Sequence, residues 1–324
     1  MNLLFYLLVF LLVLIVSSTT NKLLPFLPMP LIQILLGIGI GLCLPNNQYH
    51  LDTELFLALV IGPLLFREAQ EADITSILKH WRIVLYLIFP VIFISALSMG
   101  GVAHVLWASL PLAACVAVGA ALGPTDLVAF ASLSQRFSFP KRVSNILKGE
   151  GLLNDASGLV AFRMALIAWT TGTFSLTQAG TSLAISIVGG FAVGFITALI
   201  NRFLHTFLLS VRATDIASEL LLELSLPLLT FFIAEEIHVS GIIAVVVAGI
   251  LKASRFKKIN LLEAQVDTVT ETVWRTVTFM LNGSVFVILG MELEMIAEPI
   301  LKSAFYNKVL LLLSVFLLTF LLFA

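Results

Sequence analysis

The sequence predicts an all-α polytopic membrane protein, and three observations support this. Of the 324 residues, 60% are hydrophobic and 11% are charged, and the mean hydropathy is +1.08. Soluble chains average roughly 25% charged residues. Apolar runs near the ~20 residues that cross a bilayer recur along the whole chain, and basic residues fall in alternate loops between them. A soluble protein of this size would need a charged surface that this composition lacks.

The apolar runs predict eleven spans, and every loop between them is short. Residues 1–17 lack a basic leading segment, which favours a first membrane helix over a cleaved signal peptide. The last run reaches Ala324 without a polar stop, so we expect a fragment, or a protein truncated inside a helix. The predicted spans are 2–17, 25–44, 53–66, 83–101, 105–134 (interrupted), 143–170, 178–205, 216–236, 239–252, 272–293 and 304–324.

The basic residues predict the orientation. One set of alternate loops holds most of the Lys and Arg, from Lys22 to the cluster that ends at Lys258, while the opposite loops hold only Lys302 and Lys308. Cytoplasmic loops carry the excess of Lys and Arg. The N-terminus is therefore expected outside, and Ala324 inside.

Composition also argues against several kinds of site. The net charge of −1 provides no basic field for nucleic acid. Cys43 and Cys115 both lie in apolar runs, which argues against a disulfide framework or a thiolate metal site. No HExxH spacing occurs, and we expect no cofactor. Any chemistry should take place within the membrane or at its faces.

Asp126 lies within an apolar span, in ALGPTDLVAF. Gly123 is a poor helix former, and Pro124 has no N–H and clashes with the preceding turn, so the helix should break there. Free backbone groups at that depth line a cavity or are buried in protein. Thr125 and Asp126 stand at the break, and broken helices form ion sites in transporters. The plainer reading is a proline kink with Asp126 capping the second half-helix.

A second polar group lies in GEGLLNDASGLVAFR, residues 149–163. On a helix, Glu150 shares a face with Asn154 and can accept from its amide. Asp155 and Asp126 lie at similar depths on antiparallel neighbouring spans, so they are expected to be close. A carboxylate in a half-dry cavity can hold a proton or a small cation but not both, which is the minimum requirement for exchange.

The other charged residues have plainer explanations. Glu150 is expected to brace Asn154 or a basic residue. Arg163 is expected to anchor the outer half of its span, for example by reaching an acid on another helix. Glu219 and Glu223 could line a cytoplasmic funnel or pack. The last set should form a mostly solvated face at the inner end of a short span; it comprises Glu68, Glu71 and Asp73.

GPTDLVAF and GEGLLNDASGLVAFR together resemble the two core helices of bacterial sodium/proton antiporters of the monovalent cation:proton antiporter-1 family. EEIHVSGIIAVVVAGIL and VWRTVTFMLNGSVFVILGMEL resemble later helices of that family. The resemblance runs over nearly all of the chain. It implies a thirteen-helix homodimer with inverted repeats, a scaffold of residues 1–82 and 174–300, and an ion-translocating core of 83–173 and 303–324.

The resemblance also implies roles for individual residues. Asp155 would be the shared cation and proton site, with Asn154 beside it. Thr125 and Asp126 would form the crossing of the broken helix. Glu150 would brace Asn154, with an arginine on the eleventh helix as its partner.

This sequence departs from the family pattern at three places. Gly151 stands where the family often has a serine. The acid found on the third helix of some members has no clear match, since Arg67 follows Phe66 and Glu68 comes one residue later. The chain also ends before a twelfth span, so the second broken helix and the bracing arginine are not expected within it.

The sequence is interpreted as an electroneutral exchanger of Na⁺ (or Li⁺) for H⁺ in a bacterial inner membrane, working by alternating access rather than as an enzyme. K⁺/H⁺ exchange is the alternative, because one carboxylate and backbone oxygens do not select the cation. An intramembrane aspartyl protease using Asp126 and Asp155 is disfavoured, since the chain has no GxGD motif. A remnant that does not transport is a third possibility, raised by the predicted truncation.

Overall fold

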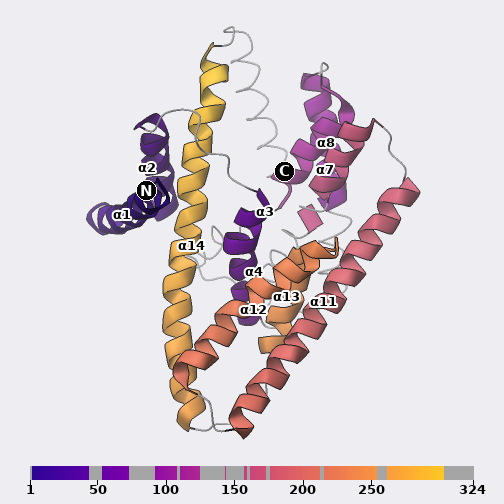
Figure 1. The fold of residues 1–324 in the computed structure, drawn as a ribbon. Coiled ribbons are helices and arrows are strands. Elements are labelled where there is room, and N and C mark those ends of the chain that lie inside the picture. The colour runs from indigo at the N-terminus through magenta and orange to yellow at the C-terminus, as the bar shows by residue number, and fades with distance from the viewer. Residues whose placement is uncertain are drawn as a thin grey trace. The chain divides into compact units, whose positions relative to one another are not determined.

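The computed structural model describes residues 2–43, 53–72, 92–107, 110–124, 143, 157–158, 161–172, 176–211, 215–253 and 261–302. Within those ranges every regular element is a helix, which confirms the predicted all-α class (Figure 1). Among the described residues, three helical segments are long and apolar enough to cross a membrane: Ala184–Ser210, Ile216–Glu236 and Thr268–Leu293.

The described parts of the predicted spans are mostly helical, including residues 161–171, which belong to the predicted span 143–170. The predicted run 304–324 lies outside the described residues. The helices are α1 (Asn2–Leu23), α2 (Met29–Cys43), α3 (Thr53–Phe56), the π-helix η1 (Leu57–Ile61), α4 (Gly62–Glu71), α7 (Ile92–Leu106), α8 (Leu112–Leu122), α11 (Leu176–Ser210), α12 (Ile216–Glu236), α13 (Gly241–Ala253) and α14 (Leu261–Lys302).

One predicted span boundary is wrong, and one helix is much longer than the span predicted within it. The run starting at 105 begins as the end of α7, and the next helix, α8, starts only at Leu112 after the extended Pro111. The span predicted over 272–293 agrees with the candidate membrane span Thr268–Leu293, but the helix that contains it, α14, already begins at Leu261 and is 42 residues long. Its first turns are polar, and hydropathy detects burial in lipid rather than helix formation.

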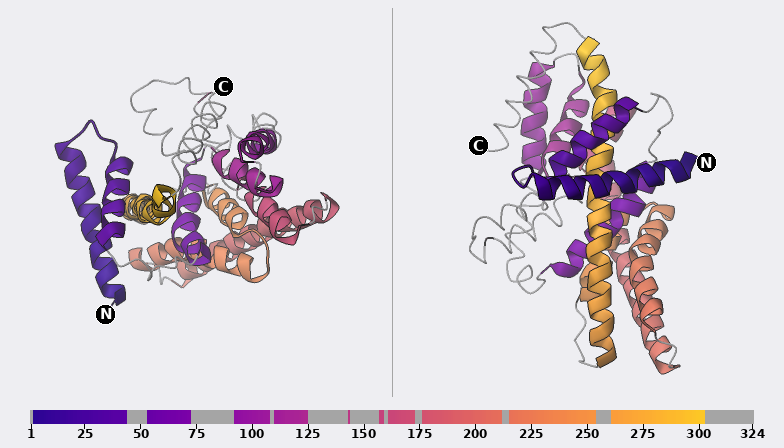
Figure 2. Two further views of the ribbon diagram at one scale, coloured as in Figure 1. Left: turned by 90° about the horizontal axis from the view of Figure 1, so that it is seen from above. Right: turned by 90° about the vertical axis from the view of Figure 1, so that its left-hand side faces the viewer.

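One compact unit consists of Met1–Leu64, Arg212–Leu224 and Lys258–Lys308. Its main contact joins α2 to α14, where Gly37 lies against the Val287 carbonyl and Gly290 against the Ile34 carbonyl. Figure 2 shows α1 crossing α14 at a steep angle. The absence of Cβ atoms at the two glycines lets the helix backbones meet, as small residues do in membrane helix pairs.

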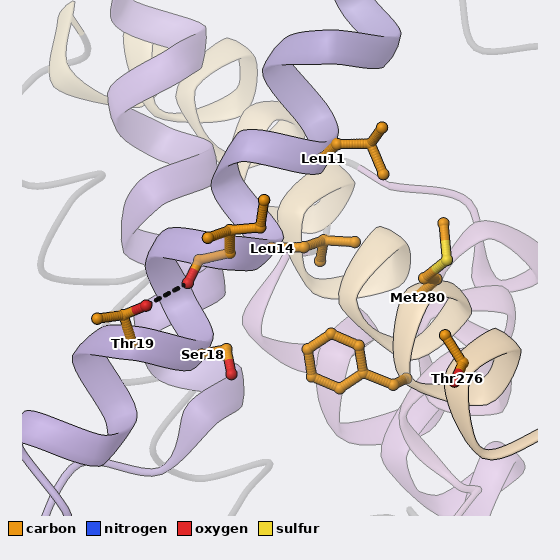
Figure 3. A pocket seen from close by; sticks show the side chains of 8 residues that line it. Leu11, Leu14, Ser18, Thr19, Thr276 and Met280 are labelled. Atoms are coloured by element: carbon orange, nitrogen blue, oxygen red, sulfur yellow. Dashed lines mark hydrogen bonds between the residues drawn. The ribbon is translucent and has the colours of Figure 1, made fainter. Parts of the chain in front are cut away.

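A groove of about 380 Å³ lies between α1 and α14 in this first unit. Leu11 and Leu14 on α1 face Met280 on α14 across it, and the Thr19 hydroxyl donates to the Ile15 carbonyl on its own helix at 2.9 Å (Figure 3). The lining is mostly apolar and holds no carboxylate, so this groove lacks the chemistry of a cation site.

The second compact unit consists of Leu65–Val211, Ser225–Lys257 and Val309–Ala324. In it α7 pairs with α8 and α11 pairs with α13 (Figure 1). Gly190 meets the Ser240 carbonyl and Gly194 meets the Ala244 carbonyl, so the backbones of α11 and α13 approach closely. This unit holds the described residues on either side of the predicted ion site.

Candidate functional site

The predicted helix break follows the end of α8. That helix ends at Leu122, and Gly123 keeps a right-handed helical backbone (φ −69°, ψ −40°) before Pro124. Thr125 and Asp126 come next and lie outside the described residues. The helix therefore stops where the Gly-Pro pair predicts, and the second half-helix stays a prediction.

Gly158 brings the second predicted segment to this break. A Cβ added to Gly158 would overlap the ring of Pro124, so only glycine permits the contact. Glu150, Asn154 and Asp155 lie outside the described residues. Along the chain, however, Pro124 is two residues before Asp126 and Gly158 is three residues after Asp155. The described ends of the two segments thus lie side by side.

Small residues hold the helical stretch 161–171 against α7 and α8. Ala96, Ala120 and Ala161 form a buried cluster, with Phe93 and Phe162 packed on it. Each alanine comes from a different helix, and their small side chains allow the three helices to meet closely. This cluster fixes the depth and rotation of the segment that follows Asp155.

Arg163 reaches an acid on another helix, as predicted. Its Nη1 lies 3.9 Å from Oε1 of Glu235, in the last turn of α12. The same carboxylate oxygen accepts the backbone N–H of Gly241 at 3.3 Å, at the start of α13. An acid near a helix N-terminus is favourably placed for the helix dipole. Arg163, α12 and α13 therefore meet at one carboxylate.

A set of buried polar contacts between α11, α12 and α13 was missed by the sequence reasoning. Thr230 donates to Oγ1 of Thr197 at 2.9 Å, and Thr197 donates to the Val193 carbonyl at 2.9 Å. Lys252 donates to Oδ1 of Asn201 at 3.0 Å. Thr197 and Asn201 are four residues apart in an apolar run, and that spacing is the signal that could have revealed them.

The remaining predicted acids divide into buried and exposed residues. Glu219 and Glu223 are buried on α12, and both take part in interactions, which favours the packing role over an open funnel. Glu71 is 63% exposed and pairs with Arg67 at 2.8 Å within α4, in agreement with a solvated face, whereas Glu68 on the same helix is half-buried. Asp73 lies outside the described residues.

A family model described as "Sodium/hydrogen exchanger, transmembrane" matches residues 7–324. The chain belongs to this sodium/hydrogen exchanger family. It is accordingly a multi-pass membrane protein. The family assignment agrees with the resemblance carried by the two core motifs.

Curated relatives of this exchanger-family chain are named as antiporters. A "Sodium, potassium, lithium and rubidium/H(+) antiporter" of Bacillus subtilis (strain 168) is 36% identical over 304 residues, covering 94% of this chain and 45% of that protein. The Bacillus pumilus (strain SAFR-032) protein of the same name is 36% identical over 292 residues, covering 90% and 44%. The chain thus spans about half the length of these relatives.

The solved structure of the sodium proton antiporter MjNhaP1 from Methanocaldococcus jannaschii at pH 8 has a similar fold. The TM-score is 0.67 at 19% sequence identity, covering 90% of this chain and 71% of that one. At this level of identity the likeness concerns the fold alone. It agrees with the predicted sodium/proton-antiporter fold.

Proposed function

We propose that this protein exchanges a monovalent cation for a proton across the membrane, as a secondary antiporter. The observation that carries the proposal is the contact between Pro124 and Gly158 in a chain of the exchanger family. This contact joins the predicted helix break to the segment that holds the predicted ion carboxylate. A broken helix beside an intramembrane acid is a recurrent arrangement for transported ions.

In this proposal Asp155 binds either the cation or the proton. Thr125 and Asp126 contribute at the crossing of the broken helix, while Asn154 and Glu150 hold the shape of the Asp155 segment. The competition of two ligands for one carboxylate couples their movements when access alternates between the two faces. Residues 83–173 and 303–324 form the moving core, and residues 1–82 and 174–300 form the scaffold.

Na⁺ or Li⁺ is the proposed cation, exchanged one-for-one with H⁺. Potassium is the second candidate, and the names of the two Bacillus relatives, which include sodium, potassium, lithium and rubidium, favour a broad range of alkali cations. The proposed setting is a bacterial inner membrane, with the N-terminus outside and a homodimer as the working form.

The test is proton flux in everted vesicles carrying the protein. Addition of Na⁺ should collapse a preset pH gradient, and Asp155→Asn should abolish this response because an amide cannot exchange a proton for a cation. Glu71→Gln serves as a matched control on an exposed carboxylate and should leave exchange unchanged. Normal exchange by the Asp155→Asn variant would remove Asp155 from the mechanism.

The same vesicles test stoichiometry and cation choice. A one-for-one exchange moves no net charge, so an imposed membrane potential should leave its rate unchanged. A strong dependence on potential would reject electroneutral exchange. Parallel additions of Na⁺, Li⁺ and K⁺ then rank the cations, and a response to K⁺ equal to that for Na⁺ favours the second candidate.

A further inference from the structure

The Arg163–Glu235 ion pair connects the helix of the predicted ion site to a separate group of helices. On one side, the stretch 161–171 continues from Gly158, which contacts Pro124. Arg163 is eight residues after Asp155 in the sequence, and the predicted span 143–170 would place them about 12 Å apart along one helix. On that prediction, a movement of the span would move both Arg163 and the predicted ion carboxylate.

On the other side, Glu235 belongs to a group of helices held together by several contacts. Its carboxylate accepts the Gly241 N–H, which ties the end of α12 to the start of α13. Thr230, also on α12, donates to Thr197 on α11. Gly194 holds α11 close to α13. The partner of Arg163 is thus part of a braced set of three helices.

Both residues belong to the predicted outer half of the membrane. Arg163 lies outward of Asp155 along its own span, and Glu235 lies at the end of α12 next to a loop predicted to face outside. The two depth predictions come from separate stretches of sequence. The ion pair agrees with both, because residues in contact must lie at a similar depth. The contact therefore lies on the outer side of the predicted ion site.

The strength of the pair suits a contact that forms and breaks. The side chains of Arg163 and Glu235 are 46% and 26% exposed, and their charged atoms are 3.9 Å apart. A pair of this kind contributes modestly and cannot lock a structure. A modest contribution is nevertheless enough to shift an equilibrium between two conformations severalfold, provided that the pair forms in only one of them.

We propose that Arg163 and Glu235 are a positioning pair that closes the outer side of the ion path. The pair forms when Asp155 faces the cytoplasm and separates when Asp155 faces outside. This inference rests on the proposed exchange and on the predicted orientation. The pair sets how the protein divides between states in which Asp155 is open to the outside and to the cytoplasm. Asp155 itself binds the cation.

The first experiment compares the apparent KM for Na⁺ at the two faces, using right-side-out and everted vesicles. Arg163→Gln and Glu235→Gln should each lower the outer KM relative to the inner KM by about three- to fivefold, because the outward-open state gains population. The double variant Arg163→Glu with Glu235→Arg should return the ratio to within twofold of wild type. Arg163→Lys keeps the charge and should also stay near the wild-type ratio.

Arg275→Gln is the matched control. Arg275 pairs with Glu271 at 3.7 Å on its own helix, and both side chains are largely exposed. Removal of this charge should leave the ratio of the two KM values unchanged. An unchanged ratio in both single variants at the Arg163–Glu235 pair, or a charge swap that behaves like the single variants, would overturn the proposal.

A labelling experiment separates failure of this pair from failure of the proposed exchange. A cysteine is introduced at the buried Ser157 after Cys43→Ser and Cys115→Ala. A membrane-impermeant maleimide applied from outside should label it severalfold faster when Arg163→Gln is added. Faster labelling without any cation-driven proton flux would overturn the exchange but support the pair, whereas unchanged labelling in a transporting protein would overturn the pair.

Discussion

The contact of α2 with α14 and the contact of α11 with α13 use the same device but differ in what surrounds it. In both, glycines bring one helix against the carbonyl oxygens of the other: Gly37 and Gly290 in the first contact, Gly190 and Gly194 in the second. Around the first contact lies mostly apolar surface with one buried amide, Gln33.

Around the second contact, side-chain hydrogen bonds join three helices. Thr230 and Thr197 link α12 to α11, and Lys252 and Asn201 link α13 to α11. Each such bond between membrane helices contributes only about 0.6 kcal/mol on average. Close backbone packing at the glycines therefore accounts for the helix contact in both regions. The side-chain hydrogen bonds of the second region specify which helices meet and in which register.

The largest expected effect comes from filling the glycine contacts. Gly37→Leu and Gly194→Leu each place a side chain against a backbone carbonyl that cannot move alone, and overpacking of this kind costs about 1–3 kcal/mol. Gly39→Leu and Gly101→Leu are the matched controls, since a Cβ at either position meets no atom within 4 Å. Size-exclusion chromatography in detergent measures the folded fraction. Equal loss in variants and controls would contradict the close approach.

The next effect is smaller and belongs to the second region. Thr230→Val removes the donor to Thr197 at a fully buried position and should lower stability by about 0.6 kcal/mol. A double-mutant cycle with Thr197→Val, read from thermal unfolding in detergent, should show coupling between the two positions. Additive losses would mean that the hydroxyls act separately.

A third effect tests the turn between α12 and α13. His238 has a positive φ of 59°, and the N–H groups of His238 and Val239 bond to the carbonyls of Glu235 and Ala234, which is a Schellman motif. Glycine accepts this conformation without strain, so His238→Gly should raise stability by about 0.5 kcal/mol. The midpoint of thermal unfolding measures it, and a lower midpoint would show that the imidazole makes a stabilising contact.

The smallest effect is expected at the buried amide of the first region. Gln33 donates to Oγ of Ser17 at 3.5 Å, a long hydrogen bond. Replacement by an apolar side chain of similar shape can be nearly neutral, so Gln33→Met should change stability by less than about 0.5 kcal/mol in the same unfolding assay. A loss as large as that of Thr230→Val would erase the distinction between the two regions.

Much of the fold could be predicted from the sequence because span formation is a local property. The run 216–236 was predicted with the same bounds that α12 has in the structure. The start of α14 could not be predicted, because its first turns are polar and carry no membrane signal. The start of α8 was misplaced because the span was predicted from hydrophobicity alone, which does not detect the extended backbone at Pro111.

The candidate site was predictable only in part. Gly123 and Pro124 indicated where α8 stops, since each weakens a helix by its own backbone chemistry. Arg163 was expected to find an acid, but Glu235 could not be identified as that acid from the sequence. The Thr197–Thr230 hydrogen bond was missed for the same reason. The local sequence around a residue does not identify its partner on another helix.

By itself, the sequence determined that this chain belongs in a bilayer and where most of its described helices run, because transfer into lipid depends on each segment's own composition. Only the tertiary structure decided that Gly158 faces Pro124 and that Arg163 meets Glu235. Only the structure, too, decided that the space beside Gly37 is occupied by a neighbouring helix while the space beside Gly39 is empty. These facts depend on how one helix rotates against another, and that rotation is set by close contacts between residues far apart in the chain.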